Sequence, residues 1–190
     1  MDIKINRCSW PGETLLMIEY HDKEWGVPLH DDLKHFEFLV LDAFQAGLSW
    51  LIVLNKREAF RIAFDGFDYS IIANYTQAKI DLLNNDASII RNKAKIKATV
   101  SNAIAFMEIQ KEFGSFDRFI WRFTNFKTKI NYCENMTQIP VSSPESIEMS
   151  KELKRRGFKF VGPTICYAYM QAAGMVNDHL TSCFRYNDCC

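Results

Sequence analysis

Two cysteines and two histidines stand near opposite ends of the 190-residue chain. Cys8 and His21 lie near the N-terminus, and His179 and Cys183 lie near the C-terminus. Two thiolates and two neutral imidazoles form a ligand set that suits tetrahedral zinc. A helix would place His179 and Cys183 on one face, because they are four residues apart. If the four residues converge in space, they predict one structural zinc ion that joins the two ends of the chain.

The spacing of these residues leaves other interpretations open. Cys8 and His21 are much further apart than the ligands of a zinc-finger half-site. Buried cysteines often act only as small apolar side chains, and a lone histidine often only makes hydrogen bonds. Cys189 or Cys190 could replace Cys183 as the fourth ligand. The N-terminal sequence has no apolar stretch typical of a secretory signal, so we do not expect a disulfide framework.

A second group of residues combines aromatic rings with one carboxylate. The first 50 residues contain Trp10, Tyr20, Trp25 and Trp50, and Asp42 lies in an otherwise apolar segment of the same region. Aromatic faces and a partly buried carboxylate could hold a flat cationic heterocycle by stacking and cation–π attraction. The alternative is that the aromatic residues belong to the core and that Asp42 is paired locally.

Residues 151–164 combine a glycine-to-glycine turn with positive charge. A helical pattern precedes Gly157, and a second one follows Gly162. The basic residues of this segment are Lys151, Lys154, Arg155, Arg156 and Lys159. Free N–H groups at the start of the second helix, beside basic side chains, suit a DNA phosphate. An ordinary solvated helix end is the alternative interpretation.

The elements that must position these residues are helices, because apolar side chains recur with helical periodicity along most of the chain. We expect helices to start at Asp31 or Asp32, after Ser49, at Ser143 and at Gly162. A further helix is expected to bury Ile96, Val100, Ala103, Ile104 and Met107 and to expose the basic residues of 91–97. Residues 127–132 read as an irregular connection. The sequence therefore predicts an all-α protein, a single unit over residues 1–190 that could divide into two helical lobes.

Composition and charge exclude several classes of protein. Aromatic residues make up 14% of the chain and hydrophobic residues 48%, which excludes a disordered chain. We expect a cytoplasmic protein without membrane association, because no apolar run is long enough for a span. The net charge of zero argues against a general nucleic-acid coat, but the charge is segregated. Residues 1–50 hold four basic and nine acidic side chains, whereas residues 91–97 hold four basic side chains and no acid.

Taken together, these segments resemble the bacterial DNA-3-methyladenine glycosylase I family over nearly the full chain. The segments that carry the resemblance are Arg7-Cys8-Ser9-Trp10, Tyr20-His21-Asp22-Lys23-Glu24-Trp25-Gly26-Val27-Pro28, Gln45-Ala46-Gly47-Leu48-Ser49-Trp50, Arg155-Arg156-Gly157-Phe158-Lys159-Phe160-Val161-Gly162-Pro163-Thr164 and Asn177-Asp178-His179. The resemblance implies a helix–hairpin–helix glycosylase fold with a zinc clasp between the N- and C-terminal segments. It also implies base excision repair, in which the enzyme flips 3-methyladenine out of alkylated double-stranded DNA and hydrolyses its N-glycosidic bond.

The resemblance assigns roles to individual residues. The zinc ligands would be Cys8, His21, His179 and Cys183. Asp42 would accept a hydrogen bond from the flipped base and act as the catalytic residue. The remaining substrate-binding residues would be Tyr20, Trp50, Trp10, Trp25 and Met17. The DNA-binding residues would be Gln45, Gly47 and Leu48, as a wedge in the duplex, and Lys154, Arg155, Gly157, Lys159, Gly162 and Thr164 in the hairpin.

The sequence departs from the family pattern at two positions. The family usually has glutamate at the position of Asp42, so the carboxylate here is set back by about 1.5 Å. It commonly has tyrosine at the position of Met17, whose thioether can pack on a flat ring but offers no hydroxyl. These departures keep open an alternative function, a zinc-clasped module that binds damaged DNA with little turnover. No lysine is identifiable as a Schiff-base nucleophile, so we expect a monomeric, monofunctional glycosylase without strand cleavage.

Overall fold

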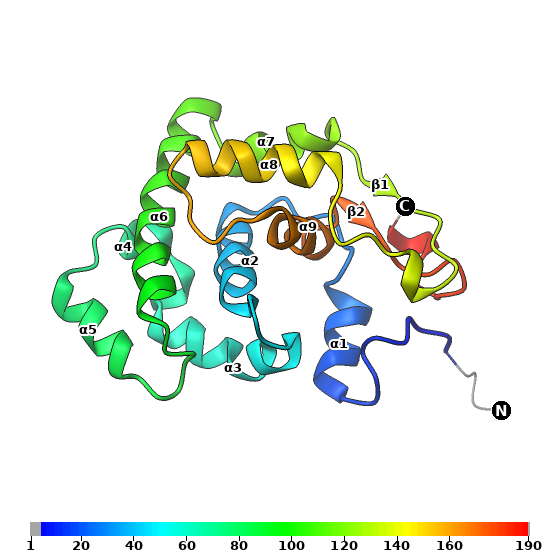
Figure 1. The fold of residues 1–190 in the computed structure, drawn as a ribbon, viewed down its shortest axis with the longest axis horizontal. Helices are drawn as coiled ribbons and strands as arrows, with labels where there is room; N and C mark the ends of the chain where they lie inside the picture. Colours follow the sequence, from blue (N-terminus) through cyan, green and yellow to red (C-terminus); the bar gives the residue numbers. More distant parts are fainter. Residues whose placement is uncertain (1–4, 190) are drawn as a thin grey trace.

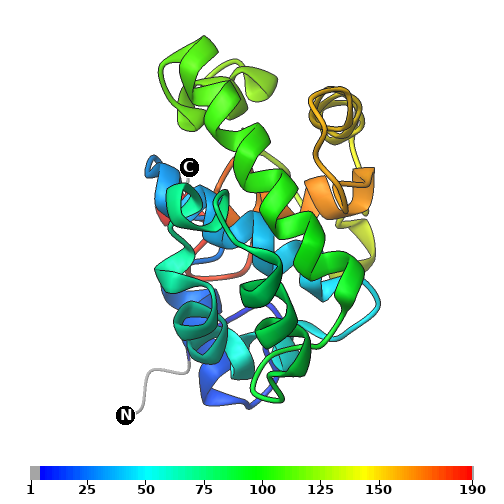
Figure 2. The same ribbon diagram turned by 90° about the vertical axis from the view of Figure 1, so that its left-hand side faces the viewer.

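The computed structural model describes residues 5–189, and helices form most of this part (Figures 1 and 2). The α-helices are α1 (Leu15–Lys23), α2 (Asp32–Gln45), α3 (Trp50–Ala63), α4 (Tyr69–Ile72), α5 (Gln77–Asn85), α6 (Lys93–Phe113), α7 (Phe116–Trp121), α8 (Pro144–Arg155) and α9 (Pro163–Ala172). Short 3-10 turns lie at 65–67, 122–124, 136–138 and 187–189. Among the described residues, no helix has the length and apolar character that crossing a bilayer requires.

Local sequence signals set the helix boundaries, as predicted. The side chain of Asp31 accepts a hydrogen bond from the Lys34 backbone N–H at the start of α2. Ser143 caps α8 in the same way, with Pro144 in the first turn. Gly157 follows the end of α8 with a φ of 94°, a conformation that favours glycine.

Helix α2 lies at the centre of the fold and packs against α3, α6, α7 and α9 (Figure 1). Aromatic side chains dominate this core; the fully buried phenylalanines include Phe36, Phe44, Phe60, Phe64, Phe67, Phe106, Phe116 and Phe119. Helix α8 packs on α9, and the connection between them begins beside α6 and turns back to α9 (Figure 1). Because α2 and α9 are in contact, residues far apart in the sequence meet in the middle of the molecule.

Two expectations about secondary structure are wrong in detail. Residues 127–132 are not wholly irregular, because β1 (Lys129–Ile130) pairs in parallel with β2 (Val176–Asn177). This pairing holds the segment after α9 against the middle of the chain. The buried face of α6 is also rotated from its predicted position, because Ile104 is 50% exposed and Lys95 is only 7% exposed. The α2 carbonyls that meet this face accept hydrogen bonds from the Lys95 ammonium, which makes its burial tolerable.

Candidate active site and metal centre

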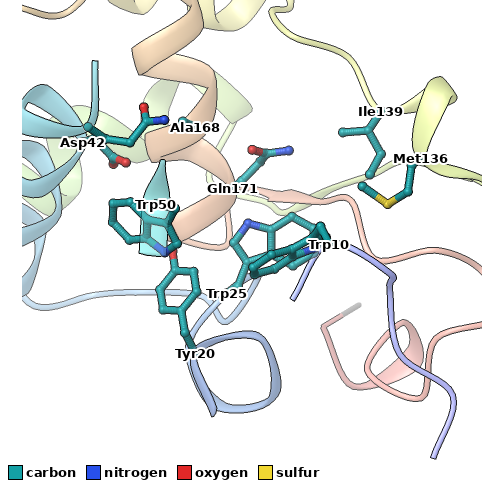
Figure 3. Close-up of a pocket in the computed structure, with 10 residues that line it drawn as sticks. Trp10, Tyr20, Trp25, Asp42, Trp50, Met136, Ile139, Ala168 and Gln171 are labelled. Carbon is teal, nitrogen blue, oxygen red and sulfur yellow. The ribbon is translucent and has the colours of Figure 1, made fainter. Parts of the chain in front are cut away.

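A pocket of about 250 Å³ opens where α1, α2, α3 and α9 approach one another (Figure 3). Its lining residues are Trp10, Tyr20, Trp25, Asp42, Gln45, Trp50, Met136, Ile139, Ala168 and Gln171. The pocket brings together the aromatic residues and the carboxylate that the sequence singled out. Asp42 reaches the pocket even though its side chain is shorter than the glutamate usual in the family.

The pocket contains buried polar atoms without hydrogen-bond partners. Within the described structure, Asp42 Oδ2, Trp10 Nε1 and Trp50 Nε1 have none. An unpaired buried donor or acceptor costs about 1–3 kcal/mol, and native proteins leave few of them. Three such atoms on one pocket indicate that a ligand, rather than the protein itself, satisfies them.

Asp42 is the strongest electrostatic feature of this pocket. Its side chain is 3% exposed, and burial raises its pKa well above the usual value. Burial also raises the pKa of the Tyr20 hydroxyl, and the nearby charge of Asp42 adds to that shift. The charged form of Asp42 is therefore costly in the free protein and becomes favourable when a cation enters the pocket.

The aromatic rings form walls at steep angles to one another. The Trp10 and Trp25 ring centroids lie 5.1 Å apart at 69°, and those of Tyr20 and Trp50 lie 5.2 Å apart at 53°. The Trp10–Trp25 contact is edge-to-face and the Tyr20–Trp50 contact is tilted, so neither pair is stacked face to face. Ring faces therefore remain available to stack on a flat ligand (Figure 3).

Four of the lining residues have no sequence signal that points to the pocket. Met136 and Ile139 come from the segment before α8, and Ala168 and Gln171 come from α9, so no local pattern joins them to residues 10–50. Met17, expected to bind substrate, is buried in the core and is not among the lining residues.

Cys8, His21, His179 and Cys183 converge on one buried point, where their ligand atoms all lie within 4.8 Å of one another. Cys183 Sγ lies 3.6 Å from both His21 Nε2 and His179 Nδ1, and Cys8 Sγ lies 3.8 Å from His179 Nδ1. Zinc bonds of about 2.3 Å to sulfur and about 2.0 Å to nitrogen place tetrahedral S and N ligands about 3.5 Å apart. The cluster fits that geometry.

Surrounding groups orient both imidazoles toward the cluster. His21 Nδ1 donates to Asp22 Oδ1 at 2.8 Å, which leaves Nε2 free to bind a metal. His179 Nε2 lies 3.0 Å from the Trp25 carbonyl, so it donates and leaves Nδ1 facing the cluster. The hydrogen bond with Cys8 lowers the pKa of the Cys183 thiol, which favours a thiolate. Such outer partners are typical of metal-binding histidines.

Two details of the metal prediction change. Residues 179–183 form a turn rather than a helix, in which the Cys183 N–H donates to the Leu180 carbonyl. Cys189 is buried but lies outside the cluster, with its Sγ 3.5 Å from an Arg185 nitrogen. Cys190, the other alternative ligand, lies outside the described residues.

The cluster of Cys8, His21, His179 and Cys183 shares a wall with the pocket. The Trp25 carbonyl accepts from His179, and the Trp25 ring lines the pocket. The Trp10 ring centroid lies 5.4 Å from that of His21. Gly26 has a φ of 81°, and a Cβ there would meet His179 Nε2 at 3.0 Å. The cluster therefore sits directly behind the aromatic wall formed by Trp10 and Trp25.

The residues expected to bind DNA lie in two loops. Gly47 is exposed and Leu48 half-buried in a turn closed by hydrogen bonds between Gln45 and Leu48. In the hairpin, 156–162, Gly157 and Lys159 are exposed, and Lys154 and Thr164 are exposed in the helices beside it. Gly162 is half-buried and precedes α9. Arg155 is exposed but forms a double hydrogen bond with Glu152, so it is less free to bind phosphate than Lys154.

A helical fold in which an aromatic pocket ends on a buried carboxylate is suited to a base-recognition protein of the DNA glycosylase class. A family model described as methyladenine glycosylase matches residues 10–186. The chain therefore belongs to the methyladenine glycosylase family.

Individual relatives agree with this assignment. The chain is 44% identical over 182 residues to the DNA-3-methyladenine glycosylase 1 of Escherichia coli, covering 96% of this chain and 97% of that protein. A crystal structure of a 3-methyladenine DNA glycosylase I superposes with a TM-score of 0.92 at 46% identity, over 94% of this chain and 98% of that one. A Staphylococcus aureus enzyme, whose structure concerns 3-methyladenine recognition, gives a TM-score of 0.92 at 34% identity over 96% and 97% of the chains.

Proposed function

We propose that this protein is a DNA glycosylase that releases 3-methyladenine from alkylated DNA by hydrolysing the N-glycosidic bond, as the first step of base excision repair. The observation that carries the proposal is the unpartnered carboxylate of Asp42 inside an aromatic pocket. Its relatives are named for this activity, and one has been studied for its recognition of 3-methyladenine.

Methylation at N3 supplies the property that such a pocket selects. The methylated base is cationic, whereas adenine is neutral. A cation stacked on Trp50 or Tyr20 gains cation–π attraction, and its amino hydrogens can reach Asp42. In a buried site, the pairing of a cation with a carboxylate is much stronger than in water, so it offsets the cost of ionising Asp42. A neutral base offers no such compensation.

The same positive charge explains why few catalytic groups are needed. A cationic purine leaves readily and takes the bonding electron pair with it, while water adds to the sugar carbon and loses a proton. Asp42 holds the leaving base, and the aromatic walls replace the stacking that the base loses on flipping. The developing positive charge of the sugar is stabilised by the DNA phosphates around it.

We further propose that Cys8, His21, His179 and Cys183 bind one structural zinc ion. Four protein ligands leave no open position for water, so zinc would stabilise the fold and take no part in the reaction. Its contribution would be to fix the Trp10–Trp25 wall through His21 and His179. The proposed substrate is double-stranded DNA, bound through the 45–48 turn and the hairpin by a monomeric cytoplasmic protein that acts as a single unit.

The decisive experiment is incubation with methylated duplex DNA, followed by chromatography of the released bases. We expect free 3-methyladenine from the wild-type protein and a loss of about 100-fold or more in rate for Asp42→Asn, which removes the charge but keeps the shape. Asp81→Asn, an exposed change outside the pocket, serves as the matched control. Binding of methylated DNA without release of a base would overturn the glycosylase proposal and favour a damage-binding module.

A further inference from the structure

Helix α6 contacts both of the loops that the proposed function assigns to DNA. Near its start, Lys95 Nζ donates to the backbone carbonyls of Phe44 at 3.0 Å and Ala46 at 2.9 Å, where α2 ends and the 45–48 turn begins. Further along, Asn102 exchanges two hydrogen bonds with the backbone of Lys159 in the hairpin, at 2.8 and 3.1 Å. One helix therefore holds both loops.

The two contact residues share one face of the helix. Lys95 and Asn102 are seven residues apart, which is nearly two turns and about 10 Å along the axis. Both side chains are buried, at 7% and 4% exposure. The Lys95 ammonium also lies 5.9 Å from the centroid of the Phe160 ring in the hairpin, within the range of a cation–π interaction. The separation between the loops is thus set by a continuous helix.

A lysine is a costly residue to bury at this position. No carboxylate pairs with its ammonium in the described structure, and burial lowers its pKa. The last carbonyls of a helix can accept hydrogen bonds from water or from the following backbone. The C-terminal end of α2 therefore does not require a buried cation. Loops without such anchors are mobile. The cost of burying Lys95 is therefore explained if the function of the 45–48 turn depends on its exact position.

We propose that Lys95 and Asn102 are positioning residues, which hold the 45–48 turn and the hairpin at a fixed separation while a base leaves the duplex. The inference rests on the proposed function. A wedge that enters the space of the departing base works only if the phosphates are held at a matching distance. Displacement of positioning groups by about 1 Å can cost about 100-fold in rate. Neither side chain lines the pocket, so we expect recognition of the free base to depend on them less than the duplex reaction does.

The test separates the duplex reaction from base binding. Lys95→Met removes the donors and keeps a long apolar side chain, and Asn102→Leu removes both hydrogen bonds to the hairpin. Release of 3-methyladenine from methylated duplex DNA should fall about tenfold or more in each variant. The affinity for free 3-methyladenine, measured by tryptophan fluorescence, should stay within about twofold of wild type. Lys95→Arg, which keeps two donors, should recover most of the rate.

Lys56→Met is the matched control. Lys56 also donates to two backbone carbonyls, those of Ala87 and Ser88, but these lie in the connection between α5 and α6, outside both loops. Its loss should leave the duplex rate unchanged. Wild-type duplex rates in Lys95→Met and Asn102→Leu would overturn this inference but leave the proposed function standing. A loss of free-base affinity as large as the loss in duplex rate would have the same consequence. If Lys95→Met does not fold, Asn102→Leu decides. A wild-type protein that releases no base would overturn the proposed function as well.

Discussion

The Cys/His cluster and the pocket lie back to back, but they differ in how many of their polar groups have hydrogen-bond partners. In the cluster, His21 and His179 each have a hydrogen-bond partner on the side away from the thiols. In the pocket, Asp42 Oδ2 and Trp50 Nε1 have no partner in the described structure. The histidines of the cluster are hydrogen-bonded within the protein, whereas the unpaired polar atoms of the pocket are available to a ligand. The groups with partners inside the protein and the groups available to a ligand thus lie on opposite sides of the wall formed by Trp10 and Trp25.

The largest test of this contrast is removal of a cluster ligand. Cys8→Ser should abolish zinc binding and reduce the free energy of unfolding by more than about 3 kcal/mol, because it leaves buried polar ligands without their metal. Metal analysis and calorimetry measure both effects. Cys133→Ser, a buried cysteine outside the cluster, should keep its metal. Unchanged metal content in Cys8→Ser would rule out the proposed zinc site.

The same type of change in the pocket should have the opposite effect on stability. Asp42→Asn should lose activity, as set out above, yet unfold at the same or a higher temperature than wild type. The reason is that asparagine removes the cost of burying a charge that has no partner. Differential scanning calorimetry at neutral pH measures the shift. A large fall in the melting temperature would show that Asp42 supports the fold instead.

The pH dependence of that stability difference sharpens the comparison. Burial raises the pKa of Asp42, so the folded protein binds the carboxyl proton more tightly than the unfolded chain does. Its contribution to stability is fully present below the unfolded pKa of about 3.9 and is lost as the pH rises through the folded pKa. The stability of Asp42→Asn relative to wild type should therefore increase with pH. A difference that stays constant with pH would contradict the raised pKa.

The smallest expected effect concerns the indole N–H of Trp50. Trp50→Phe keeps an aromatic face but removes the unpartnered donor. The affinity for free 3-methyladenine should fall about threefold to tenfold, which corresponds to one hydrogen bond of about 1 kcal/mol. The melting temperature should change little. Fluorescence of the remaining tryptophans and calorimetry measure the two quantities, and an unchanged affinity would mean that this N–H does not contact the base.

Features that depend only on neighbouring residues follow from the sequence alone. The start of α8 at Ser143 and its end before Gly157 follow from side-chain capping and a left-handed backbone, both of which act within a few residues. The residue types of the candidate zinc ligands and of the pocket residues also follow from the sequence, since thiolates, imidazoles, aromatic rings and carboxylates have distinct chemistry. The resemblance to the glycosylase family then assigned their roles, and the comparisons confirm the family.

Which of these residues meet depends on the packing of the whole chain. The fold places Cys183 rather than Cys189 in the cluster, and it brings Met136, Ile139, Ala168 and Gln171 to a pocket whose remaining lining residues come from the first 50 residues. It also buried Lys95, which the charge pattern had placed in solvent. The periodicity of apolar residues predicts that a helix has a buried face. The residues that pack against this face, however, come from elements far away in the sequence. Their positions follow from packing of the whole core, which no local pattern contains.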